Sequence, residues 1–344
     1  MKSSSGEDPT AIPSPQLPNP IGSIQSYTWR LYRWTLNGWN RFWFTPRSAY
    51  WLGILRIAAG IMLLYTHWIW GWDFDGFLGP ERRISEQFIG QMNPTSWHWS
   101  HFDWIQDPTA LGIVHWLGLA CLLAFTLGLG MPWTGWLSVL FAISYAHRAT
   151  GALFGLDQMN VALVTYLTLG RAGRHWSLDR WWKLRQAGRA GQGGRSQLPA
   201  IHYDVWTNIG TRLIQIQLCI IYWFAGTGKL QGVSWWNGEA LWGAFASYQY
   251  QSVDLTWLYN YPIILALLTH ITIVWEVGYT FLVWPRWSRP LMVTMAVLVH
   301  TGIGLFLGMM TFGYIMVVAN LSFVEWPQLF PPADRHRDDF DDCA

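Results

Sequence analysis

Eight long apolar segments constrain the fold of this chain more than any other feature of its sequence. They lie at residues 51–70, 108–129, 132–147, 156–170, 212–228, 261–284, 290–308 and 311–325. About 20 consecutive apolar residues form a helix long enough to cross a bilayer, and a helix satisfies its own backbone hydrogen bonds there. The sequence therefore predicts an all-α, polytopic membrane helix bundle with about eight transmembrane helices.

The composition agrees with a membrane location and excludes several classes of partner and cofactor. Hydrophobic residues make up 51% of the chain, charged residues only 12%, and there are 27 tryptophans. The net charge of +2 is too small to indicate a nucleic-acid partner. Cys121 and Cys219 lie in apolar segments and Cys343 lies near the end, a spacing that predicts neither a disulfide framework nor a metal site.

The two ends of the chain differ from its apolar middle. Residues 1–22 are rich in proline and serine, which predicts a disordered tail, and residues 329–344 form a polar C-terminal tail. Between 23 and 47, aromatic residues such as Trp29 and Trp34 alternate with Arg30 and Arg33. This pattern predicts an amphipathic helix that lies in the membrane interface.

The distribution of basic residues predicts the orientation in the membrane. Arginine and lysine gather before the first apolar segment, between residues 171 and 195, and at Arg286 and Arg289. Loops rich in these residues stay in the cytoplasm, so both termini are expected there, in a bacterial inner membrane. Lys229 falls in an outer loop, where a positive charge is not the default.

Ionisable residues within the apolar segments are the candidates for a functional site. A helix rises about 1.5 Å per residue, which places His270 and His300 at a similar depth, with Lys229 at the outer mouth and Asp157 and Asn160 between. Such residues usually line substrate pathways. A structural alternative remains open, because a lysine can snorkel and histidine or asparagine can join helices by hydrogen bonds.

Two further charges, Arg56 and Glu276, have a structural interpretation. Both lie in the cytoplasmic halves of their segments, at compatible depths. We expect them to form one buried ion pair, because an unmatched charge in a low dielectric is costly.

Several motifs together resemble the transmembrane domain of vitamin K-dependent gamma-glutamyl carboxylase and its bacterial relatives, the horizontally transferred transmembrane (HTTM) domain proteins. They are "GILRIAAGIMLLY", "RHWSLDRWW", "YWFAGTGKLQGVSWW", "LLTHITIVWE" and "VLVHTGIGLFLGMMTFGYIMVVANLSFVEWP", within residues 48–328. The resemblance implies that Lys229 is the catalytic base acting on vitamin K hydroquinone. It also implies that His270 and His300 lie near the reaction centre.

The same resemblance implies the cosubstrates and the remaining pocket residues. Reduced vitamin K, or a similar menaquinol, would react with O2 to give a strong base, and CO2 would capture the carbanion of a glutamate-containing substrate. No metal is implied. Trp223, Trp235 and Trp236 lie within the motif and are the expected pocket tryptophans. Burial of the amine among Trp223, Phe224 and Trp235 would disfavour its charged form. An Asn-Asn-His motif of the family corresponds to "FGLDQMN" here, so Asp157 and Asn160 are open candidates for its role.

Other functions remain open from the sequence. The chain ends soon after "EWPQLF", without the long domain that holds a protein substrate in the carboxylases, so the acceptor of a carboxyl group is not defined. One alternative is a quinone- or lipid-binding membrane protein with other redox chemistry. Another is a non-catalytic transporter or scaffold, although the sequence shows no inverted repeat of the kind that transporters have.

Overall fold

The structure is a computed structural model that describes residues 20–79, 88, 91, 99–105, 107–149, 152–189 and 203–324. The predicted polar tail at 329–344 and most of the predicted tail at 1–22 lie outside the described residues. The chain divides into two compact units, Met1–Thr45 and Pro46–Ala344. Each unit is described by itself.

The first unit contains one helix, α1, over Pro20–Phe44. Most of its aromatic side chains, including those of Trp29 and Trp34, are exposed. The ring of Trp29 stacks on that of Tyr32, with the ring centroids 5.5 Å apart. The helix covers most of the segment predicted to lie in the interface, and its place at the membrane surface stays a prediction.

The described part of the second unit is helical apart from one short antiparallel pair of strands, β1 (Arg47–Ser48) and β2 (Tyr203–Asp204). The longer helices are α2 (Tyr50–Trp72), α5 (Pro108–Leu127), α6 (Trp133–Arg148), α7 (Gly155–Leu169), α8 (Leu178–Arg189), α9 (Val205–Lys229), α12 (Pro262–Leu282), α13 (Arg289–Phe306) and α14 (Met310–Asn320). The short elements are α3 (Phe74–Phe77), η1 (His101–Trp104), η3 (Ala172–Arg174), α10 (Val233–Trp236), α11 (Ala240–Phe245), η4 (Thr256–Asn260) and η5 (Leu321–Phe323).

Five of the helices in the described residues are long and apolar enough to cross a membrane: α2, α5, α9, α12 and α13. This confirms the prediction of a mostly helical protein with membrane-spanning segments. The other three predicted spans are also helices, but α6, α7 and α14 have only 16, 15 and 11 residues. At about 1.5 Å per residue they are shorter than a hydrocarbon core of about 30 Å.

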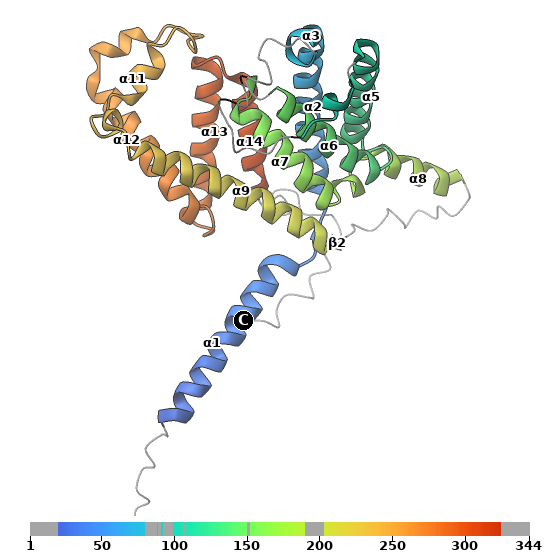
Figure 1. Cartoon of the computed structure of the whole chain (residues 1–344). Coiled ribbons are helices and arrows are strands. Elements are labelled where there is room, and N and C mark those ends of the chain that lie inside the picture. The colour runs from blue at the N-terminus through green and yellow to red at the C-terminus, as the bar shows by residue number, and fades with distance from the viewer. Residues whose placement is uncertain are drawn as a thin grey trace, which may run out of the picture. The chain divides into compact units, whose positions relative to one another are not determined.

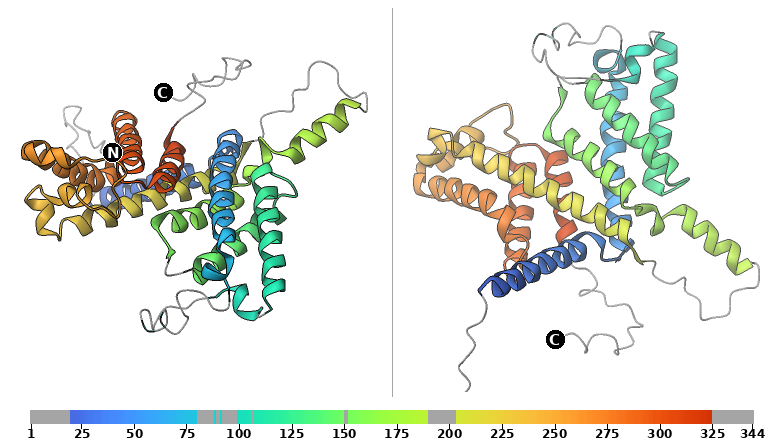
Figure 2. Two further views of the ribbon diagram at one scale, coloured as in Figure 1. Left: turned by 90° about the horizontal axis from the view of Figure 1, so that it is seen from above. Right: turned by 60° about the horizontal axis from the view of Figure 1, so that its bottom comes forward.

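Helix α9 connects two groups of helices within the second unit. It packs on α7 near its start and on α12 near its end (Figures 1 and 2). On the α7 side, α2 packs against α5 and α7, and α6 packs against α7. On the other side, α13 packs mainly against α14. Buried side chains such as Leu163, Ile214 and Ile315 form one apolar core that joins both groups.

The predicted ion pair between Arg56 and Glu276 is wrong. The guanidinium of Arg56 is fully buried and donates to three backbone oxygens in the turn after α7, those of Ala172 (2.9 Å), His175 (3.4 Å) and Trp176. Helix depth gives the level of a residue but not its neighbour, and a guanidinium with five donors suits a turn with several free carbonyls. The carboxylate of Glu276 has a different cation as its partner.

Candidate functional site

The partner of Glu276 is Lys229, the last residue of α9. Its Nζ donates to Oε2 of Glu276 on α12 across 2.6 Å. The side chains of Lys229 and Glu276 are 22% and 10% exposed, so the Lys229–Glu276 pair is largely but not completely enclosed. A short bond between two charged groups is stronger than a neutral one, so this pair fixes the end of α9 against α12.

The backbone around Lys229 explains why the two helices come so close. A Cβ atom on Gly226 would lie 2.9 Å from the backbone nitrogen of Val277, so only glycine allows this approach. After α9 the chain turns into α10, and in the turn that follows α10 Gly238 has a φ of +79°, a conformation that glycine adopts without strain. This segment brings the ring of Trp235 to 5.2 Å from the Lys229 amine, within the range of a cation–π contact.

The amine lies deeper than the sequence predicted. Glu276 is fourteen residues from the start of α12, a rise of about 21 Å, whereas His270 is eight residues from it, a rise of about 12 Å. Lys229 is therefore not at a mouth above the histidines. Residues 230–261, which include α10, α11 and η4, pack against the first half of α12 instead.

A buried chain of hydrogen bonds lies beside this pair and joins four helices. Tyr279 on α12 donates to Oδ1 of Asn320 on α14 (2.6 Å), and Nδ2 of Asn320 donates to the oxygen of Tyr222 on α9 (2.9 Å). The hydroxyl of Tyr222 lies 2.8 Å from Nε2 of His300 on α13. All four side chains are buried.

The partners in this chain define the direction of each bond. Nδ2 of Asn320 also donates to the Met316 carbonyl, which can only accept, so the orientation of the amide is fixed. Tyr222 accepts from Asn320, and His300 Nε2 is the one acceptor within reach of its hydroxyl proton in the described residues, so we assign Tyr222 as the donor of this bond. A neutral His300 then carries its proton on Nδ1, and this buried N–H has no partner among the described residues.

The pair and the hydrogen-bonded chain are electrically coupled. The charge of Lys229 acts on His300, and that of Glu276 acts on Tyr222. Lys229 and His300 are thus near enough for their charges to interact, and a shared functional site stays a prediction. The arrangement places an ion pair near a histidine nitrogen that has no hydrogen-bond partner among the described residues.

His270 does not belong to this group. Its ring is exposed, with Nδ1 2.7 Å from the Ala266 carbonyl and Nε2 3.2 Å from that of Trp236. These contacts brace α10 against α12. The prediction that His270 shares a pocket with His300 and Lys229 is not supported by any contact in the described residues.

The two predicted polar residues of α7 have separate roles. Asp157 accepts a hydrogen bond from the backbone of Phe154 (2.9 Å) and so caps the start of the helix. Asn160 is buried, and neither atom of its amide has a hydrogen-bond partner. No contact in the described residues joins either side chain to Lys229.

Only one of the predicted pocket tryptophans contacts the amine. That residue is Trp235, described above. Trp223 packs edge-on against Phe281 and is 37% exposed, and Phe224 is 70% exposed. Trp236 is also exposed, and its Nε1 donates to the Leu230 carbonyl. The expectation that Trp223 and Phe224 bury the amine is wrong, because both lie on the outward face of α9.

Sequence reasoning missed Tyr222, Tyr279 and Asn320. Asn320 carried a usable signal, since an amide inside an apolar segment needs a partner. The tyrosines gave none, because a tyrosine is common in membrane helices and only its neighbours reveal its hydrogen bonds.

A second group of histidines surrounds Tyr145, on the α2, α5 and α6 side of the unit. Nδ1 of His115 lies 2.6 Å from the Tyr145 hydroxyl, and the ring of His67 lies 4.5 Å from that of Tyr145. His101 contacts the same tyrosine, and its burial lowers its pKa to about 4, so it is neutral near pH 7. These rings pack as an aromatic cluster with no charged partner among them, which indicates a structural role.

The comparisons with known proteins add no family to this geometry. No family model matches the chain, and searches of curated proteins and of solved structures gave no match either. In the described residues, no group of three or more histidine, cysteine, aspartate or glutamate side chains is placed to hold a metal ion. The Lys229–Glu276 pair and its neighbour His300 are therefore the candidate functional site on geometry alone.

Proposed function

We propose that this chain is an integral membrane enzyme that removes a proton from a lipid-soluble quinol, with Lys229 as the base. The observation that carries this proposal is the 2.6 Å contact between Lys229 and Glu276 inside the membrane-spanning helices. Ionisable groups at such positions are expensive and are usually kept for function. The sequence resemblance to vitamin K-dependent gamma-glutamyl carboxylase supports the same assignment.

The pair makes the amine available as a base. When the proton between Nζ and Oε2 moves to the carboxylate, both groups become neutral, a change that an apolar environment favours. The free amine then takes the proton of a quinol hydroxyl, which leaves a lysine ammonium, a neutral Glu276 and a quinolate oxygen.

His300 supplies the second element of the site. Its buried Nδ1–H lacks an acceptor among the described residues, and a quinolate oxygen would provide one. The hydrogen-bonded chain from Tyr279 through Asn320 and Tyr222 holds the ring in this tautomer. A preorganised donor at a developing negative charge is an effective stabiliser. These residues therefore fit a quinol hydroxyl.

The bound quinol would supply the oxygen chemistry. In vitamin K-dependent carboxylases, which the sequence resembles, this chemistry forms an epoxide and a base strong enough for carboxylation with CO2. The protein residues hold the proton and the oxygen, and they do not need a metal for either task. A glutamate-containing acceptor is part of the proposal.

The test is oxygen-dependent formation of an epoxide from a reduced naphthoquinone by the purified protein. The parent protein should produce the epoxide, and Lys229→Arg should not, because a guanidinium does not release its proton near neutral pH. Glu276→Gln should also fail, since an amide cannot take the amine's proton. The matched control is Lys183→Arg on α8, an exposed lysine far along the chain from the site.

Three results would contradict parts of the proposal. No epoxide from a folded parent protein would refute the activity. Full activity of Lys229→Arg with an inactive Glu276→Gln would make the carboxylate the base instead of lysine. Full activity of both variants would remove the pair from the mechanism.

A structural role for the pair is the second candidate, and one observation favours it. Gly226 already packs α9 tightly on α12, and the pair completes that contact. The chain would then be a quinone- or lipid-binding protein, a transporter or a scaffold. In that case Lys229→Arg would keep the ion pair and the stability of the protein, and no quinol would be consumed.

The membrane arrangement completes the proposal. Eight crossings would result if α6, α7 and α14 span the bilayer together with the five longer helices. The basic loop around α8 then lies in the cytoplasm with both termini, in a bacterial inner membrane, as the positive-inside rule favours. The oligomeric state is not part of the proposal.

A further inference from the structure

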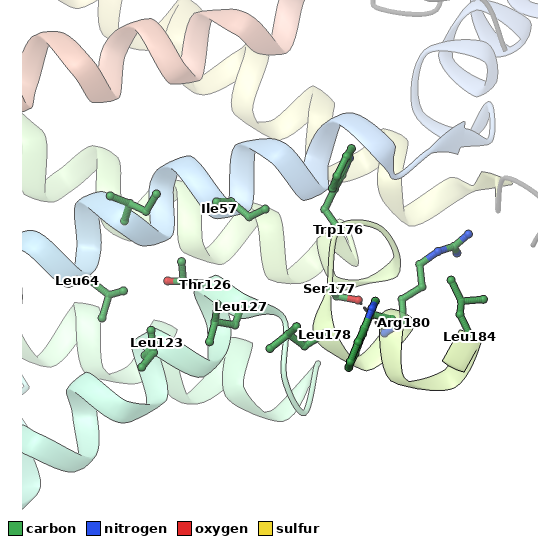
Figure 3. A pocket seen from close by; sticks show the side chains of 12 residues that line it. Ile57, Leu64, Leu123, Thr126, Leu127, Trp176, Ser177, Leu178, Arg180 and Leu184 are labelled. Carbon is green, nitrogen blue, oxygen red and sulfur yellow. Dashed lines mark hydrogen bonds between the residues drawn. The ribbon is translucent and has the colours of Figure 1, made fainter. Parts of the chain in front are cut away.

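A groove on the surface of the second unit lies well away along the chain from the Lys229–Glu276 pair. It is formed by α2, α5, the turn before α8 and α8 itself, and it has a volume of about 660 Å³ (Figure 3). Its floor consists of aliphatic side chains of the two membrane-spanning helices, such as Ile61 and Leu123. Both are about half exposed, so they face the surroundings of the bundle rather than its core.

The polar atoms of the groove wall are already satisfied within the protein. The Thr126 hydroxyl donates to the Leu122 carbonyl, and the Ser177 hydroxyl accepts from the backbone nitrogen of Arg180. These two hydroxyl groups along the groove therefore need no hydrogen bond from a ligand. A hydrocarbon chain fits it, and burial of apolar surface would favour the contact.

Positive charge gathers at the α8 end of the groove. Arg180 lines it, with Nη1 of its guanidinium donating to the Arg174 carbonyl (3.2 Å), and Lys183 and Arg185 lie on the same helix and are exposed. The acid of this helix, Asp179, is turned away, because its carboxylate accepts from the backbone nitrogens of Gly130 and Met131. Trp176 and Trp181 flank the arginine, as expected of residues at the level of lipid headgroups.

The walls are fixed before anything binds. Arg56 holds the turn before α8 through its bonds to the carbonyls of Ala172 and Trp176. Asp179 ties the start of α8 to the turn between α5 and α6. A site whose walls are already ordered loses little entropy on binding.

We propose that this groove binds one anionic phospholipid of the surrounding bilayer, with an acyl chain along α2 and α5 and its phosphate at Arg180. A guanidinium matches the geometry of a phosphate oxygen pair, and basic residues beside membrane helices attract anionic headgroups. Charge and apolar length together select this occupant, since a protein segment would not need a cation at one end of a mostly apolar groove.

The experiment uses the full chain in detergent, with phosphatidylglycerol or phosphatidylcholine added in mixed micelles. Native mass spectrometry counts the bound lipids, and a thermal melt gives the apparent affinity. We expect phosphatidylglycerol to bind more tightly than phosphatidylcholine. Arg180→Gln should weaken the binding of phosphatidylglycerol by about tenfold, the effect of one charge-assisted hydrogen bond.

Two further variants test the chain-binding part of the groove and the specificity of the effect. Ile61→Trp fills the groove and should displace both lipids, whereas Ile263→Trp, at an exposed position of α12, should displace neither. Arg286→Gln removes an exposed arginine from another loop and should leave the preference for phosphatidylglycerol unchanged. Melting of each variant without added lipid shows whether it is folded.

Several outcomes would overturn the proposal. One is equal binding of the two lipids by the parent protein. Another is an equal loss of phosphatidylglycerol binding in Arg180→Gln and Arg286→Gln, which would indicate a general charge effect. Stabilisation by inorganic phosphate as strong as that by phosphatidylglycerol would assign the arginine to a free anion. A change of oligomeric state in Ile61→Trp without any change in lipid binding would make the groove a contact between copies of the chain.

Discussion

At the scale of single residues, Tyr222 is the side chain on which the geometry of the site depends most. It accepts from Asn320 and donates to His300, so it defines which nitrogen of His300 carries a proton. Tyr222→Phe leaves Nε2 of the buried His300 without a partner and leaves Nδ2 of Asn320 with the Met316 carbonyl as its one acceptor in the described residues. We expect it to lower the free energy of unfolding by about 1–3 kcal/mol, the cost of an unsatisfied buried polar group.

Denaturant titration of the purified protein in detergent measures this effect. Tyr248→Phe is the control, because Tyr248 is 94% exposed and its hydroxyl should matter little. Equal stability of the two variants would show that the hydrogen-bonded chain does not exist as described.

Single residues also show how far the sequence could predict the site. Lys229 and His300 were predicted because ionisable side chains stand out in apolar segments. The partner of Glu276 could not be predicted, because the rise of a helix gives depth but no lateral neighbour. The same reason explains why Arg56, Asp157 and His270 were placed with the wrong groups or without a structural role.

At the scale of helices, the contact between α9 and α12 depends on one glycine. Gly226→Ala would place a Cβ 2.9 Å from the backbone of Val277, so the helices must separate and the Lys229–Glu276 distance must grow. Gly228→Ala, two residues away, meets nothing within 4 Å. Alanine is favoured over glycine inside a helix by about 1 kcal/mol, so this control should be neutral or stabilising.

Melting temperatures and quinol oxidation rates of the two variants measure the difference. Gly226→Ala should lower both quantities, and Gly228→Ala should lower neither. A Gly226→Ala protein as stable and as active as the parent would contradict the close packing of α9 on α12.

The corrected pairing of charges gives a second prediction at this scale. Arg56 belongs to the α2 contact with the turn after α7, and Glu276 belongs to the contact of α12 with α9. The effects of Arg56→Met and Glu276→Gln on unfolding free energy should therefore add, to within about 0.5 kcal/mol. The effects of Lys229→Met and Glu276→Gln on unfolding free energy should not add, because the two residues form one pair.

A double-mutant cycle for each combination distinguishes the two arrangements. Strong coupling between Arg56 and Glu276, together with none between Lys229 and Glu276, would restore the pairing that the sequence alone suggested.

At the scale of the whole molecule, the sequence predicted the helical membrane architecture well, because hydrophobic periodicity and segment length are local properties. The number of helices that cross the membrane was harder to predict from the sequence. Helices α6, α7 and α14 are apolar but short, and whether a short helix crosses depends on its neighbours and on local bilayer thickness.

Cysteine labelling in intact cells tests the orientation of the molecule. Gln186→Cys on α8 should be protected from an impermeant thiol reagent, and Tyr248→Cys, in the segment between α11 and η4, should react. The background protein has Cys121, Cys219 and Cys343 replaced. The reverse pattern would invert the topology, and labelling of both positions would show that they lie on the same side.

The most direct test of the proposed chemistry separates proton transfer from the reaction with oxygen. An ionised naphthoquinol absorbs at longer wavelength than its neutral form, so absorbance under strictly anaerobic conditions reports the proton alone. At neutral pH and with the quinol bound to saturation, the parent protein should show the quinolate band. Lys229→Arg and Glu276→Gln should show only the neutral band, and Lys183→Arg should resemble the parent. A bound quinol that stays neutral on the parent protein, or a quinolate band that persists in Lys229→Arg, would contradict the assignment of Lys229 as the base.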